Sequence, residues 1–78
     1  MTVKLEDVLQ LVRTQLGIRN LSATDRLMED LGAESADLVN LAAAAEDRFT
    51  ITFDEAKIAA VRTPNDLYNL IEITKRGT

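Results

Sequence analysis

Four stretches of the chain repeat apolar residues at the three- and four-residue spacing of an amphipathic helix. The pattern predicts helices over residues 3–16, 35–48, 55–61 and 64–73. Residues 18–34 keep no such period and are interrupted by glycine, asparagine, serine and aspartate, which predicts a long loop. Apolar residues within that loop, among them Leu27 and Leu31, are expected to hold it against the core.

Residues at the predicted helix ends support these boundaries. Thr2 can cap the first helix, and Gly17 follows it where a helix commonly stops. Asp54 can cap the third helix. Thr63 is followed by a proline and then by Asp66, a combination typical of a helix start. Residues 75–78 are predicted to be a frayed tail.

Residues 50–53 are β-branched or aromatic, but no second strand exists to pair with them. They are therefore predicted to form an extended linker that turns Ile51 or Phe53 inward. Residues 42–45 are four alanines, which favour a helix and either admit a close neighbour or leave a cavity. The expected fold is all-α: one domain over residues 1–78, a small four-helix bundle with a long first loop and a short third helix. A monomer is the simplest expectation.

Composition excludes several functions. The chain has 78 residues, 46% of them hydrophobic and 28% charged, and contains neither cysteine nor histidine. Disulfides, thiolate metal sites and the commonest general base are therefore absent, so we expect no catalytic residues and no metal site. No apolar run approaches the length needed to span a membrane and no signal peptide opens the chain, which predicts a cytoplasmic protein. The few aromatic residues argue against nucleic-acid binding.

Negative charge is concentrated in the middle of the chain. The net charge is −4, yet the segment from Glu29 to Glu55 holds eight acids and one base, Arg48, for a net charge of −7. Such a segment attracts basic protein surfaces and repels nucleic acid and anionic lipid. The simpler alternative is a solvated helix face.

Ser35 lies within this acidic segment, where the predicted loop becomes a helix. A phosphate on its hydroxyl would lie near unpaired backbone N–H groups and the positive end of the helix dipole. The simpler alternative is that the serine only caps the helix.

The segment Asp30-Leu31-Gly32-Ala33-Glu34-Ser35 resembles the Asp-Leu-Gly-x-Asp-Ser motif of acyl carrier proteins. Residues 15–17, 46–49 and 63–71 also resemble the ends of that family's first and second helices and the start of its fourth. The resemblance implies that a phosphopantetheinyl transferase, with magnesium, moves 4′-phosphopantetheine from coenzyme A to Ser35. The attached 4′-phosphopantetheine, a flexible arm, would then carry acyl groups as thioesters between enzymes of a fatty-acid, polyketide or other specialised pathway.

The resemblance also implies two sets of functional residues. Docking to basic patches on the transferase and on acyl-processing enzymes is expected to use Glu34, Ala36, Asp37, Asn40, Glu46, Asp47 and Glu55. An acyl pocket inside the bundle is expected to be lined by Ala42, Ala45, Phe53, Ile58, Val61 and Leu67. Ordinary core packing is the alternative for this second set.

Several positions depart from the family pattern. Ala36 stands where leucine is usual, Asn40 where a recognition glutamate is common, and Asp54 where proline is usual. These departures favour a specialised carrier over the general carrier of fatty-acid synthesis. Two other classes stay open: a carrier-like bundle that is never modified and serves as an interaction module, and a small enzyme.

Overall fold

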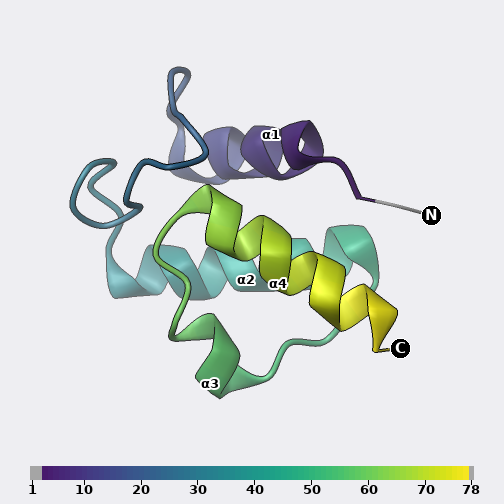
Figure 1. Ribbon diagram of the computed structural model, residues 1–78. Helices are drawn as coiled ribbons and strands as arrows, with labels where there is room; N and C mark the ends of the chain where they lie inside the picture. Colours follow the sequence, from purple (N-terminus) through teal and green to yellow (C-terminus); the bar gives the residue numbers. More distant parts are fainter. Residues whose placement is uncertain (1–2, 78) are drawn as a thin grey trace.

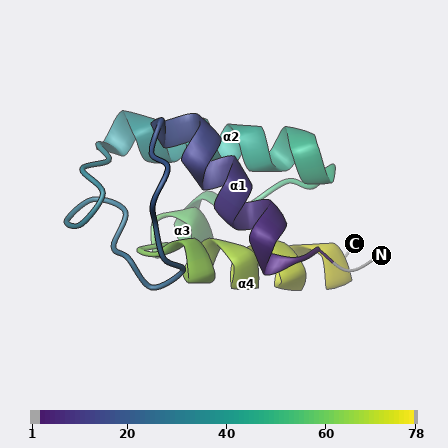
Figure 2. The same cartoon turned by 90° about the horizontal axis from the view of Figure 1, so that it is seen from above.

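A computed structural model describes residues 3–77 and contains four helices in that range. They are α1 (Leu5–Leu16), α2 (Ser35–Phe49), α3 (Glu55–Ile58) and α4 (Pro64–Arg76). In Figure 1, α1 lies above α2 and α4, with α3 below them. Seen from above, α1 crosses the space between α2 and α4 (Figure 2). The all-α bundle, its long first loop and its short third helix are confirmed.

Local capping explains most of the helix boundaries. Thr63 Oγ1 accepts from Asp66 N at 3.1 Å, and Thr63 N donates to Asp66 Oδ2 at 3.2 Å, so α4 begins as predicted. Asp54 Oδ1 accepts from Ala56 N at 2.9 Å at the start of α3. Gly17 ends α1 in the left-handed region, with φ of 67°.

Three boundaries differ from the predictions by two residues or more, and α2 ends at Phe49 rather than at residue 48. Helix α1 begins at Leu5, where Lys4 N donates to Asp7 Oδ2 at 3.4 Å; the predicted cap, Thr2, lies outside the described residues. Helix α3 ends at Ile58 rather than at residue 61. Helix α4 continues through Arg76, so residues 75 and 76 are helical rather than a frayed tail, and Lys75 Nζ donates to the carbonyl of Phe49 at 3.0 Å.

The core lies between α1, α2 and α4 and is wholly apolar among the described residues. Val8 and Val12 of α1, Leu41 of α2 and Ile71 of α4 are at most 2% exposed. The linker after α2 is extended, and both Ile51 and Phe53 are buried. The apolar pattern of residues 35–48 predicts Leu38, Val39 and Leu41 on the inward face of α2. Leu41 is buried and Leu38 half-buried, but the prediction is wrong for Val39, which is 66% exposed.

Candidate functional site

Ser35 is the first residue of α2 and is exposed. The helix is capped by its neighbours: Glu34 is extended, and its backbone N–H donates to Asp37 Oδ2 at 2.8 Å. Within residues 3–77 the Ser35 side chain has no hydrogen bond, so its hydroxyl is not consumed as a cap. A free hydroxyl therefore faces solvent at the positive end of a 15-residue helix.

The chain reaches Ser35 through a fixed turn. Gly32 has φ of 74°, a left-handed conformation that glycine adopts without a steric penalty. The next residue, Ala33, is buried, and its N–H donates to the carbonyl of Leu27 at 2.9 Å. Leu27 N in turn donates to the carbonyl of Arg62 at 2.8 Å. The loop before Ser35 is thus tied to the segment before α4.

Asp30 of the motif and its neighbour Glu29 both contact Arg26 in the loop before Ser35. Asp30 Oδ2 accepts from Arg26 N at 2.8 Å, and the Arg26 guanidinium also contacts Glu29 Oε2 at 3.1 Å. The hydrogen bond from the Arg26 backbone is the main cause that lowers the pKa of Asp30, followed by the Arg26 side chain. Both acids therefore stabilise the loop that presents Ser35.

The residues expected to dock partners do not form one uniform acidic face. Five of them are exposed: Glu34, Ala36, Asn40, Asp47 and Glu55. The other two, Asp37 and Glu46, are half-buried and already accept backbone hydrogen bonds, from Glu34 N and from Phe53 N, each at 2.8 Å. Between the acidic ends of α2 lies an uncharged exposed stripe at helical spacing, made of Ala36, Val39, Asn40 and Ala43.

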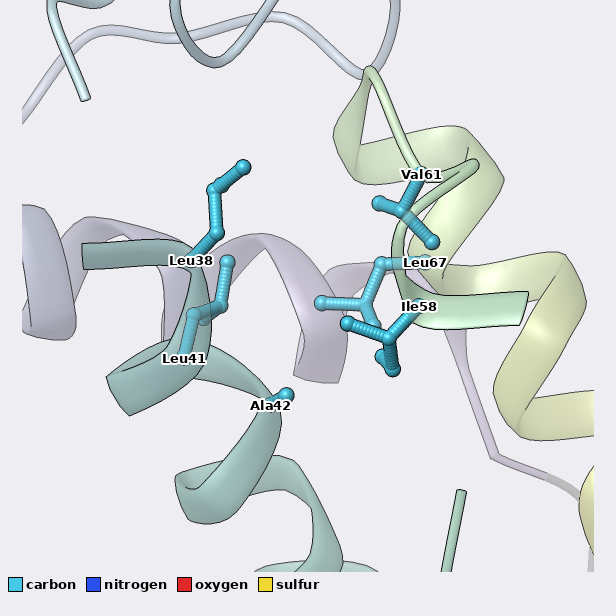
Figure 3. Close-up of a pocket in the computed structure, with 6 residues that line it drawn as sticks. All are labelled: Leu38, Leu41, Ala42, Ile58, Val61 and Leu67. Carbon is cyan, nitrogen blue, oxygen red and sulfur yellow. The ribbon is translucent and has the colours of Figure 1, made fainter. Parts of the chain in front are cut away.

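A small apolar pocket opens between α2 and the α3–α4 segment (Figure 3). Four of the six predicted lining residues are there: Ala42, Ile58, Val61 and Leu67. The other two, Ala45 and Phe53, are buried in the core but do not line the pocket. Leu38 and Leu41 line it and were missed, although both follow Ser35 on the apolar stripe of α2.

The pocket is very small. Its volume is about 10 Å³, roughly the space that one water molecule needs. Of the alanine run only Ala42 lines the pocket, and the run leaves no large cavity here. An acyl chain would enter only if the pocket widened, and α3, which has four residues and buries none of them, is its least anchored wall.

Residues 3–77 contain neither a cluster of metal-ligating side chains nor a helix able to span a membrane. They hold no group of three or more histidine, cysteine, aspartate or glutamate side chains that could bind a metal ion. No helix within this range has the length and apolar character to cross a membrane.

Comparison with known proteins identifies similar chains. Residues 6–71 match the family model described as a phosphopantetheine attachment site. Acyl carrier protein 3 of Ralstonia nicotianae is 42% identical over 62 residues, covering 77% of this chain and 71% of that protein. The acyl carrier protein of Thermotoga maritima is 33% identical over 67 residues, covering 83% of each chain. A solved structure from Mycobacterium tuberculosis, assigned as an acyl carrier protein, superposes with a TM-score of 0.83 at 26% identity, covering 88% of this chain and 95% of the other.

Proposed function

This chain belongs to the acyl carrier protein family, which carries 4′-phosphopantetheine covalently, and on that premise we propose that Ser35 is the attachment residue. The observation that carries the proposal is the free, exposed hydroxyl of Ser35 in the first turn of α2. Unpaired N–H groups of this turn would stabilise a phosphate there. Ser35 is open to solvent, and within residues 3–77 its hydroxyl has no competing hydrogen bond. Both features are compatible with a covalently attached 4′-phosphopantetheine.

The chain's own part in the attachment is to present a nucleophile. Ser35 Oγ forms a bond to the β-phosphorus of coenzyme A as adenosine 3′,5′-bisphosphate leaves. The hydroxyl proton passes to a base of the transferase, because no side chain within residues 3–77 is hydrogen-bonded to the Ser35 hydroxyl and placed to accept it. When bound, the group supplies a terminal thiol that holds an acyl chain as a thioester. The protein is then a carrier with no catalytic residue of its own.

Partner enzymes are proposed to bind the α2 face around Ser35. Exposed Glu34 and Asp47 lie near opposite ends of α2 and provide negative charge for basic patches on those enzymes. The uncharged stripe between them favours partners whose contact surface combines basic groups with an apolar centre. Glu46 contributes less than its charge suggests, since Phe53 N already occupies one of its carboxylate oxygens.

We further propose that the protein serves a dedicated pathway. Ala36 and Asn40 are exposed on the docking face, where the family commonly has leucine and glutamate, so enzymes that read those side chains would bind this chain more weakly. The test is turnover with enzymes of general fatty-acid synthesis, beside a housekeeping carrier. Equal efficiency for the two carriers would contradict the proposal.

Intact mass tests the attachment. The protein is incubated with coenzyme A, magnesium and a phosphopantetheinyl transferase from its own source. The chain has only two serines, so Ser22→Ala is a matched control for Ser35→Ala. The wild type and Ser22→Ala should gain one phosphopantetheine, and Ser35→Ala should gain none. An unmodified wild type would instead favour an interaction module that never takes the arm.

A further inference from the structure

Arg62 occupies the corner between α3 and α4, where both sides of its backbone are fixed. Its N–H donates to Asp66 Oδ2 at 3.1 Å, within the first turn of α4. Its carbonyl accepts from Leu27 N at 2.8 Å. The side chain is nevertheless exposed. The fold therefore sets the starting point of this side chain while leaving its guanidinium free to turn.

Two observations place this corner at the same end of the bundle as Ser35. First, Leu27 bonds to Arg62 through its N–H and to Ala33 through its carbonyl, at 2.8 and 2.9 Å, so one residue bridges Arg62 and the approach to Ser35. Second, Val61 and Leu38 line the same pocket, and Leu38 lies one turn into α2 from Ser35 (Figure 3). Both overall views show the first loop, the start of α2 and the start of α4 at one end of the bundle (Figures 1 and 2).

Among the described residues, Arg62 is a cation outside any ion pair at the α3–α4 corner. Glu34 and Asp37 flank Ser35 and would repel an anion bound there. The Arg26 guanidinium is already paired with Glu29 and Asp30. Arg62 forms no ion pair within 4.0 Å with any of residues 3–77. It is thus an available positive charge at the same end of the bundle as the hydroxyl.

We propose that Arg62 is a positioning residue that pairs with the phosphate carried by Ser35. A guanidinium is planar and always charged, and its paired N–H donors match two phosphate oxygens. The contact would offset repulsion by the neighbouring acids and hold the root of the arm toward the α3 side of the pocket. The inference rests on the proposed attachment at Ser35.

Nuclear magnetic resonance of the arginine side chains tests this contact. Nε–Hε resonances are compared between the unmodified and the phosphopantetheinylated protein, after intact mass has established the modification. Arg48 is the matched control, because it lies on α2 about 20 Å along the helix from Ser35. The Arg62 resonance should move on modification while that of Arg48 stays. The change should shrink toward about 1 M salt, where the screening length is about 3 Å.

A second variant separates a contact from a general structural change. Arg62→Gln is expected to fold and to accept the arm, since the side chain is exposed, but its phosphorus resonance should narrow as the arm loses its anchor. Arg48→Gln should keep the phosphorus resonance of the wild type. If Ser35 is modified and neither the Arg62 nor the phosphorus signal responds, the role of Arg62 is overturned and the attachment stands. If Ser35 is not modified, the attachment fails and the role of Arg62 fails with it.

Discussion

The carboxylate of Glu46 accepts a hydrogen bond from the backbone N–H of Phe53, with 2.8 Å between Oε2 and N. This bond joins the last turns of α2 to the extended linker that leads to α3. It fixes the linker where the Phe53 ring enters the core, since Phe53 is 8% exposed. A residue expected from the sequence to serve partners is therefore also part of the scaffold that holds the linker between α2 and α3.

Glu46→Ala should lower the free energy of unfolding by about 1.5–3 kcal/mol, because a charged acceptor is lost and the Phe53 N–H is left without its partner. Glu46→Gln keeps an acceptor oxygen and should lose less. Asp47→Ala, at an exposed neighbouring position, should stay within about 0.5 kcal/mol of the wild type. Urea unfolding measures all three. Equal losses for the two alanine variants would show that the bond to Phe53 contributes nothing.

Thr50→Gly is expected to stabilise the protein. Thr50 closes α2 with φ of 56°, the one positive value among the described non-glycine residues. A left-handed backbone costs a residue with a side chain about 1–2 kcal/mol, and glycine removes this strain. Glycine is also more flexible in the unfolded chain, which lowers the stability by about 0.5–1 kcal/mol. A net gain of about 0.5–1 kcal/mol should appear as a higher urea midpoint. A lower midpoint would mean that Thr50 makes a compensating contact.

Asp30 should contribute a pH-dependent part of the stability. Its pKa is lowered in the folded protein, chiefly by the hydrogen bond from the Arg26 backbone, so its usual value of 3.8 sets the upper edge of the window. Above that value the contribution is fully present, and it is lost as the pH falls through the lower folded pKa. The difference in unfolding free energy between the wild type and Asp30→Asn should therefore be largest above about pH 5 and shrink in more acidic solution. A difference that stays constant on acidification would contradict this account.

Local sequence determined most of the fold. Helical spacing and the Thr63–Asp66 capping pair act within a few residues, and both are visible in the sequence before any packing is known. The turn before Ser35 was also marked in the sequence, by Gly32. What could not be predicted depends on contacts between distant residues. The hydrogen bond from Lys75 to the carbonyl of Phe49 joins residues 26 apart and extends α4 beyond its expected end.

The pocket likewise combines features that the sequence predicted with features that depend on contacts between distant residues. The apolar stripe of α2 was clear, but its direction was not, because alanines make the apolar face wide and weakly directional. Val39 was placed inward and is exposed, whereas Leu38 and Leu41 form the pocket wall. The side of α2 that faces the core is set by its packing against α1 and α4. The sequence pattern of a single helix contains no information on that packing.

Leu41 and Val39 provide a direct test of that assignment, because they lie two residues apart on α2 and are 2% and 66% exposed. Leu41→Ala removes buried methyl groups and leaves a cavity, so it should cost about 2.7–5 kcal/mol. A domain of 78 residues has a total stability of roughly 4–12 kcal/mol, so this loss is a large fraction of the total. Val39→Ala should change stability by less than about 0.5 kcal/mol, since its side chain is already in water. Urea titration of both variants gives the comparison, and a larger loss for Val39→Ala would mean that α2 is rotated relative to the arrangement described above.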